Sequence, residues 1–138
     1  MPAFKTLIAE DYLEFRQQLR GMLLEKTQYV VIGEVSDGLQ AVRQAEELQP
    51  DLVLLDLSLP TLNGMEAGRR IRRLSPNSKI VFLSQETSPE IVREALRMGA
   101  LGYVLKSEAT ELPAALETVM NGMRFVSSRL RPQSGAPD

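Results

Sequence analysis

The chain has 138 residues, the length of one domain, and its 43% hydrophobic and 25% charged residues are typical of an ordinary globular protein. A formal net charge of −2 offers no basic surplus for nucleic acid or an anionic membrane, so we expect neither to bind this chain directly. Cysteine and histidine are both absent, which excludes disulfides, thiolate nucleophiles and cysteine zinc sites and leaves oxygen ligands for magnesium, calcium or manganese.

The N-terminal residues carry no signal-peptide hydrophobic region, and the longest purely apolar runs, such as Leu52 to Leu55, are too short to span a bilayer. We therefore expect a cytoplasmic protein without a membrane partner. One domain is expected over residues 1–128. The polar, proline-rich stretch 129–138 has the composition of a flexible tail or linker.

Five short apolar or β-rich runs predict strands, at residues 4–9, 29–35, 52–56, 80–84 and 102–105. Three of them are apolar nearly throughout, as expected of strands that are covered on both faces of a parallel sheet.

The intervening segments have helical spacing and predict helices at residues 13–24, 38–48, 64–74, 89–98 and around 111–121. In the first helix Phe15, Leu19 and Leu23 share one apolar stripe, while Arg16 and Arg20 face away. Strict alternation of strands and helices predicts a doubly wound (βα)5 α/β domain with a parallel five-stranded sheet and helices on both faces.

Five polar residues fall where predicted strands end. Glu10 and Asp11 follow the first strand, and Asp56 ends the third. Ser84 ends the fourth strand, and Lys106 follows the fifth. Ligands of open α/β sheets bind in the crevice beyond the carboxyl ends of the strands, so we expect these side chains to form one site.

Three carboxylates in one crevice repel each other, and a divalent cation is the simplest way to keep all of them ionised. Mg²⁺ fits best, because it prefers one or two carboxylates, several waters and a phosphate oxygen. Lys106 adds a mobile positive charge and Ser84 a hydroxyl donor for the same anion. Asp56 has the central place required of a nucleophile that forms an acyl phosphate.

These motifs closely resemble the response regulator receiver domains of two-component signalling. The resemblance rests on Ala9-Glu10-Asp11, Leu54 to Pro60 with Asn63-Gly64, Ser84, and Gly102 to Lys106, and it covers residues 4–128. Residues 51–66, 95–106 and 124–127 look most like receivers of the NarL/FixJ type. The resemblance implies a flavodoxin-like fold with strand order 2-1-3-4-5.

The resemblance also implies a role for each site residue. Asp56 would be the phosphoacceptor, and Mg²⁺ would be held by Glu10, Asp11, Asp56 and the backbone carbonyl of Ser58. Ser84 and Lys106 would contact the phosphoryl group. Tyr103 stands where the family places an aromatic that turns inward when the hydroxyl moves toward the phosphate.

A sensor histidine kinase is the implied phosphodonor, and the implied output face is the fourth helix, fifth strand and fifth helix. A homodimer could form through that face or another. NarL/FixJ receivers normally precede a LuxR-type helix-turn-helix domain, which is absent here, so DNA binding and transcriptional control would pass through that missing domain. We expect no dedicated enzymatic activity beyond slow self-dephosphorylation.

Three further features of the sequence add no functional residue to this site. Many receivers follow the lysine with proline, whereas Ser107 follows Lys106 here, which leaves the isomer of that peptide bond open. Arginines at positions 69, 70, 72 and 73 look like a solvated helix face. Gly33 to Gly38 has phosphate-loop spacing but lacks the following Lys and Ser or Thr, so nucleotide binding is rejected.

Two other functions compete with a phosphorylation switch. A pseudo-receiver would keep the fold and the acidic pocket and act as a constitutive interaction module, against which the intact set of site residues argues. A phosphatase with an aspartyl-phosphate intermediate would usually carry a general acid two residues after its nucleophile, where this chain has Ser58.

Overall fold

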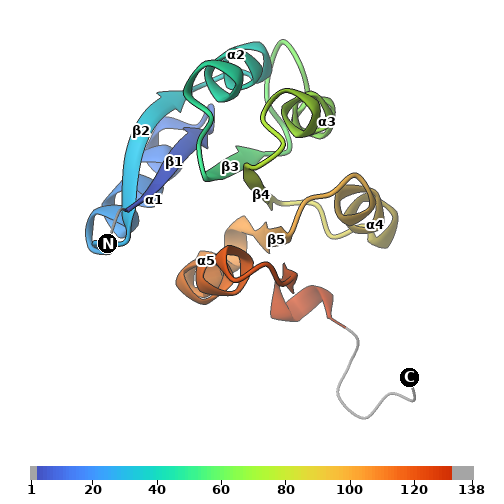
Figure 1. Cartoon of the computed structure of the whole chain (residues 1–138). Helices are drawn as coiled ribbons and strands as arrows, with labels where there is room; N and C mark the ends of the chain where they lie inside the picture. Colours follow the sequence, from blue (N-terminus) through green and yellow to red (C-terminus); the bar gives the residue numbers. More distant parts are fainter. Residues whose placement is uncertain (1–2, 132–138) are drawn as a thin grey trace.

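The structure, a computed structural model, describes residues 3–131 and places helices on both faces of one sheet (Figure 1). Its strands are β1 (Phe4–Ala9), β2 (Tyr29–Val35), β3 (Leu52–Asp56), β4 (Lys79–Ser84), β5 (Gly102–Leu105) and β6 (Phe125–Val126). Its α-helices are α1 (Leu13–Leu24), α2 (Gly38–Leu48), α3 (Gly64–Leu74), α4 (Pro89–Arg97) and α5 (Leu112–Met120). Two 3₁₀-helices are η1 (Lys106–Glu111) and η2 (Ser128–Leu130).

The sheet has the strand order β2-β1-β3-β4-β5-β6, and every pair of neighbours is parallel. The expected doubly wound fold with the order 2-1-3-4-5 is therefore confirmed. The expected count of five strands is corrected by β6, which pairs with Gly102 and Tyr103 of β5. With two residues, β6 is too short to produce the alternation by which a strand is recognised in a sequence.

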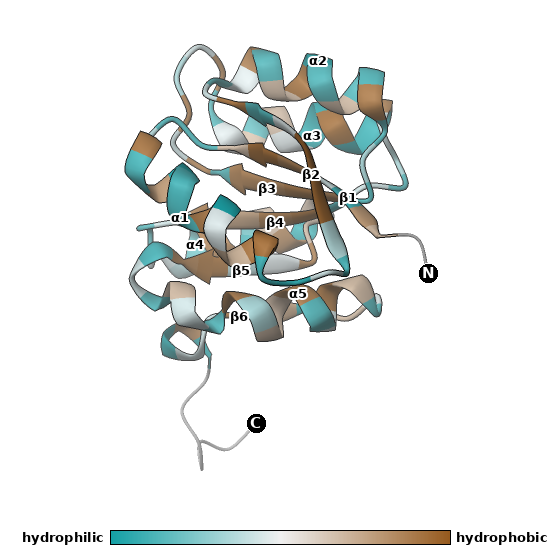
Figure 2. Cartoon of the chain, turned by 90° about the vertical axis from the view of Figure 1, so that its left-hand side faces the viewer, coloured by the Kyte–Doolittle hydropathy of each residue, from teal (hydrophilic) through white to brown (hydrophobic). Residues whose placement is uncertain are grey.

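Two apolar clusters lie on opposite faces of the sheet. Helices α2, α3 and α4 pack in one cluster, and α1 and α5 pack in the other. The alternation of side chains along a strand divides β3 between them: Val53 and Leu55 join the first cluster, and Leu52 and Leu54 join the second. Figure 2 shows the result as apolar strands enclosed by helices that turn hydrophilic residues outward.

The loop after β3 packs tightly against the start of α3. A Cβ atom on Gly64 would lie 2.1 Å from the backbone oxygen of Asp56, so only glycine permits this approach. The Gly64 N–H donates to the Leu57 oxygen at 2.8 Å, and the Asn63 side chain caps α3 by accepting from the Glu66 N–H. These contacts fix the backbone around the end of β3.

The segment after α5 is attached to the end of β5. Ser127 is fully buried, its hydroxyl accepts from the Leu105 N–H at 2.7 Å, and its own N–H donates to the Tyr103 oxygen at 3.0 Å. Part of the expected tail over residues 129–138 follows it: Arg129 and Leu130 belong to η2, while 132–138 lie outside the described residues. The division into a domain and a tail stays a prediction.

None of the helices in residues 3–131 has both the length and the hydropathy needed to cross a membrane.

We predict that Ser127→Ala lowers the free energy of unfolding by about 1 to 3 kcal/mol, because the buried Leu105 N–H loses its acceptor. Urea unfolding followed by circular dichroism measures this loss. Ser128→Ala is the control: that residue is exposed, and its hydroxyl bonds Glu108 at the surface, so a loss below about 0.5 kcal/mol is expected. Equal losses in the two variants would contradict the role given to Ser127.

Candidate functional site

The parallel strands bring the predicted site residues together at one edge of the sheet. Carboxylate oxygens of Glu10, Asp11 and Asp56 all lie within 4.8 Å of one another. Glu10 and Asp56 are buried, at 0% and 1% exposure, whereas Asp11 is exposed. The site therefore combines two buried acids with a third that faces solvent.

Lys106 is the positive charge of this cluster. Its Nζ atom lies 2.8 Å from Oε1 of Glu10 and 3.2 Å from Oδ2 of Asp56, and it sits 5.0 Å from the centre of the Phe15 ring. Burial lowers the pKa of Lys106, but the close contact with the Glu10 carboxylate and the charges of both acids outweigh it, so the pKa is raised. The ammonium group therefore stays charged at neutral pH.

The two carboxylate oxygens of Glu10 differ in their contacts. Its Oε2 atom accepts from the Tyr12 N–H at 3.0 Å. Oε1 makes the ion pair with Lys106, but the geometry is not that of a hydrogen bond, and Oε1 is the buried side-chain polar atom in residues 3–131 that lacks one. Burial is the largest influence on Glu10 and raises the pKa of its carboxyl, with the charge of Asp56 adding to the effect.

Oε1 of Glu10, which has an ion pair with Lys106 but no hydrogen bond, bears on whether a cation fits the site. A buried carboxylate oxygen without a hydrogen bond, in an all-oxygen cluster with two further carboxylates, is a donor set that suits a hard divalent ion. The residues present therefore fit Mg²⁺.

An open pocket of about 590 Å³ gives access to the site from solvent. Asp56 and Lys106 line it from the sheet edge, and Ser58 lines it from the loop after β3. The Ser58 N–H also donates to Oδ1 of Asp56 at 3.0 Å. The other residues that line the pocket belong to the turn before α1, to α1 itself and to the loop after β4: Asp11, Tyr12, Glu14, Phe15, Gln18, Gln85 and Glu86.

Ser84 and Tyr103 meet at the peptide groups of Glu86. The Ser84 hydroxyl accepts from the Glu86 N–H at 2.9 Å, and the Tyr103 hydroxyl donates to the Glu86 oxygen, also at 2.9 Å. Tyr103 is completely buried, and burial raises the pKa of its phenol, which therefore remains a neutral donor. The aromatic ring thus points inward, with its hydroxyl on the loop that follows β4.

Two contacts in the site are absent from the sequence-based predictions. Phe15 was expected only as a core residue, yet its ring lies beneath the Lys106 ammonium. Arg16 was expected to face away, but its Nη1 atom donates to the backbone oxygen of Glu10 at 2.9 Å. An acidic pair followed by an arginine in the first turn of a helix is the signal that could have indicated the second contact.

The peptide bond between Lys106 and Ser107 is trans, which resolves the isomer that the sequence left open. The strand–turn segment after β5 therefore needs no cis geometry to place Lys106 over the two acids.

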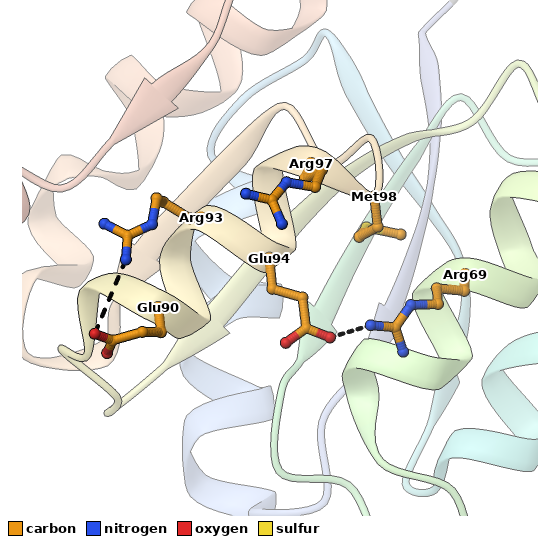
Figure 3. A pocket seen from close by; sticks show the side chains of 6 residues that line it. All are labelled: Arg69, Glu90, Arg93, Glu94, Arg97 and Met98. Carbon is orange, nitrogen blue, oxygen red and sulfur yellow. Dashed lines mark hydrogen bonds and ion pairs between the residues drawn. The ribbon is translucent and has the colours of Figure 1, made fainter.

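A second hollow, of about 520 Å³, lies between α3 and α4, away from the acidic cluster (Figure 3). Arg69 pairs across it with Glu94, and Glu90 and Arg93 form a pair along α4. The four arginines of α3 do not reach the acidic site: Arg69 and Arg70 also pair with Glu66, and the other two are exposed. Arg69 and Arg70 are thus ion-paired with nearby acids and Arg72 and Arg73 face solvent, as expected of a solvated helix face.

Comparisons with known proteins agree on one family. The family model for the response regulator receiver domain matches residues 6–117. The transcriptional regulatory protein YdfI of Bacillus subtilis is 36% identical over 107 residues, which are 78% of this chain and 50% of that protein. The nitrate/nitrite response regulator protein NarL of Escherichia coli K12 is 36% identical over 127 residues, which are 91% of this chain and 59% of NarL.

A solved structure supports the same assignment. The two-component response regulator of the LuxR family from Aurantimonas sp. SI85-9A1 superposes with a TM-score of 0.87 at 30% identity, over 93% of this chain and 92% of that chain. This chain thus spans only 50% and 59% of the lengths of YdfI and NarL, respectively.

We predict that Glu10→Gln stabilises the protein at pH 7 by about 0.5 to 2 kcal/mol in the presence of EDTA. The pKa of Glu10 is raised by folding above its ordinary 4.5, so the folded state binds the proton more tightly and ionisation above that pH costs stability. The gain should shrink as the pH falls below 4.5, where both states are protonated. Urea unfolding at a series of pH values measures it.

Glu47→Gln, on the exposed surface of α2, serves as the control and should leave the stability unchanged at every pH. A destabilised Glu10→Gln protein at pH 7, or a gain that persists in acid, would contradict the strain assigned to Glu10.

Proposed function

Because the chain belongs to the response regulator receiver family, in its NarL/FixJ-type subgroup, we propose that it accepts a phosphoryl group on Asp56 from a sensor histidine kinase. The observation that carries the proposal is the Lys106 ammonium, which bridges Glu10 and Asp56 at the wall of an open pocket. A carboxylate that can act as a nucleophile, a positive charge and access for a donor then lie in one place.

The chemistry follows from these positions. An Asp56 oxygen attacks the phosphorus of a phosphohistidine or a small acyl phosphate, and the new O–P bond forms as the donor's bond to phosphorus breaks. The donor leaves with that electron pair: the imidazole of a phosphohistidine takes up a proton from water, whereas an acyl phosphate releases a carboxylate that needs none. Lys106 offsets charge on the transferred oxygens, and the Ser58 N–H orients the carboxylate through Oδ1.

Receiver domains bind Mg²⁺ at an acidic pocket, and the acidic cluster here fits that ion. We assign the ion to Glu10, Asp11, Asp56 and the Ser58 backbone carbonyl. When bound, Mg²⁺ would neutralise charge on the carboxylates and on the incoming phosphoryl group. The buried Oε1 of Glu10, which has an ion pair with Lys106 but no hydrogen bond, supports this assignment.

Ser84, Tyr103 and Lys106 form the proposed switch. A phosphoryl group on Asp56 offers new acceptor oxygens to the Ser84 hydroxyl, which now accepts from Glu86. The peptide groups of Glu86 hold both Ser84 and Tyr103, so a change at Ser84 alters the loop between β4 and α4. The surface formed by α4, β5 and α5 is the proposed output face.

The activity of the whole protein is also a proposal, because the chain spans only part of its relatives. Sensor kinases are the partners of response regulators. Response regulators of the LuxR type bind DNA and dimerise. RcsB, which is 26% identical to this chain, has been solved as two dimers bound to two parallel DNAs. By analogy, a helix-turn-helix domain outside this chain would bind DNA, with a homodimer formed through the output face or another, in a cytoplasmic regulator.

Receiver domains are generally regulatory rather than dedicated enzymes. We propose more specifically that slow self-dephosphorylation is the only turnover, and the residue two positions after Asp56 supports this. Ser58 occupies it, and a hydroxyl is a poor general acid for rapid hydrolysis.

We predict that acetyl phosphate with Mg²⁺ adds one phosphate to the protein and that Asp56→Asn abolishes the addition, because the amide lacks a nucleophilic carboxylate oxygen. Intact-protein mass spectrometry measures the labelling, and EDTA should suppress it. Asp51→Asn is the matched control at the opposite end of β3, where the side chain accepts from the Lys5 N–H, and it should be labelled normally. Labelling of Asp56→Asn would place the phosphate on another residue.

We further predict that Ser84→Ala is still labelled on Asp56 but no longer transmits the label to the loop after β4. Without the Ser84 acceptor, the Glu86 N–H should exchange with solvent about fivefold faster before phosphorylation. Phosphorylation should then cause no further change in the exchange rate of the Glu86 N–H in Ser84→Ala, whereas it should change that rate in the wild type. Hydrogen exchange by NMR measures both effects.

Ser88→Ala changes a hydroxyl of the same loop that contacts Glu90 instead, so it should respond to the label like the wild type. An unaltered response in Ser84→Ala would remove Ser84 from the switch.

A further inference from the structure

We propose that Arg16 is a positioning residue for the metal-binding turn, Glu10-Asp11: its guanidinium fixes the Glu10 backbone and so raises the affinity of the site for Mg²⁺. The inference rests on the proposed function, because it concerns the ion assigned to that turn. It gives a role to a side chain that the helical pattern placed on the solvent side of α1.

The contact is made to the backbone of the turn, so it leaves the carboxylates free. Arg16 Nη1 donates to the Glu10 oxygen at 2.9 Å, while the Glu10 N–H donates to the Val35 oxygen at 3.0 Å. The peptide groups on both sides of Glu10 are therefore held, one by α1 and one by β2. With the backbone fixed, the directions of the Glu10 and Asp11 side chains are restricted before any ion arrives.

Glu34 on β2 orients the guanidinium. Arg16 Nε lies 3.5 Å from Oε1 of Glu34, and both side chains are largely covered, at 20% and 25% exposure. The planar fork of arginine can bind a carboxylate with one edge and a carbonyl with another. Arg16 thereby links α1, β2 and the turn after β1, three elements that meet beside the pocket.

Arg20 provides a natural comparison one helical turn further along α1. Its Nη1 atom lies 3.2 Å from Oε2 of the same Glu34, so it carries the same charge to the same partner. At 57% exposure it is much more open to solvent, and its contact is to Glu34 and not to the Glu10 turn. A variant of Arg20 therefore removes a positive charge near β2 and leaves the Glu10 contact intact.

The sign of the effect separates positioning from simple electrostatics. Removing a positive charge near a cation site reduces repulsion of Mg²⁺ and should tighten binding slightly. Removing a contact that orders the ligands should weaken it. The loss of a supporting hydrogen bond behind metal ligands typically costs about tenfold in affinity or more, which exceeds the electrostatic gain at a solvent-screened distance.

Mg²⁺ titration of the unphosphorylated chain, followed by calorimetry and by NMR shifts of the turn, tests the proposal. We expect Arg16→Met to raise the Mg²⁺ dissociation constant about tenfold and Arg20→Gln to leave it unchanged or slightly lower. Arg16→Lys keeps the charge without the fork and should fall between Arg16→Met and the wild type. Circular dichroism establishes that each variant is folded.

A second readout separates positioning from general damage. Labelling by acetyl phosphate should require about tenfold more Mg²⁺ in Arg16→Met, while the rate at saturating Mg²⁺ stays close to that of the wild type. An unchanged or lower dissociation constant in Arg16→Met would overturn the proposal, and so would an equal increase in Arg20→Gln. If Arg16→Met does not fold, Arg16→Lys decides by the same criteria.

Measurements on the wild-type protein distinguish a failure of the Arg16 proposal from a failure of the proposed function. Absence of Mg²⁺ binding or of Asp56 labelling in the wild type would reject the proposed function itself. Normal binding and labelling in the wild type with no shift in the Arg16 variants would reject only the role of Arg16.

Discussion

The site depends on a shortage of positive charge around two buried acids. Glu10 and Asp56 are almost completely removed from solvent and share one ammonium group, that of Lys106. Burial disfavours the ionised carboxyl, and the second acid adds to the cost, so one lysine does not balance the cluster. The remaining deficit is what the proposed Mg²⁺ would offset at this edge of the sheet.

The order of the strands creates this concentration of charge. Neighbouring strands β1 and β3 begin the two halves of the sheet, and their chains leave it toward helices that cover opposite faces. The ends of these strands bring Glu10 and Asp56 together without a long loop. The close approach at Gly64 and the N–H of Ser58 then hold the Asp56 end in place, so rigid backbone supports a strained cluster.

The strands and the site residues at their ends could be predicted from the sequence, because both follow from local hydrophobic periodicity. Strands with continuous apolar runs, such as Leu52–Asp56, are recognisable locally, and their ends predict where Glu10, Asp56 and Lys106 meet. The missed features depend on long-range contacts of single side chains. β6 exists because it pairs with β5, and Arg16 lies on the polar face of α1 whether or not its fork reaches the Glu10 carbonyl.

On the proposed function, the charge deficit also links cation binding to phosphorylation. The phosphoryl group carries about −1.5 to −2 charge in place of the single negative charge of the Asp56 carboxylate, and it competes with Glu10 for the Lys106 ammonium. As Lys106 turns toward the phosphate, Oε1 of Glu10 loses its ion pair and needs a positive charge from elsewhere. A cation at the acidic turn supplies it, so cation and phosphoryl group each raise the affinity of the site for the other, as reciprocal linkage requires.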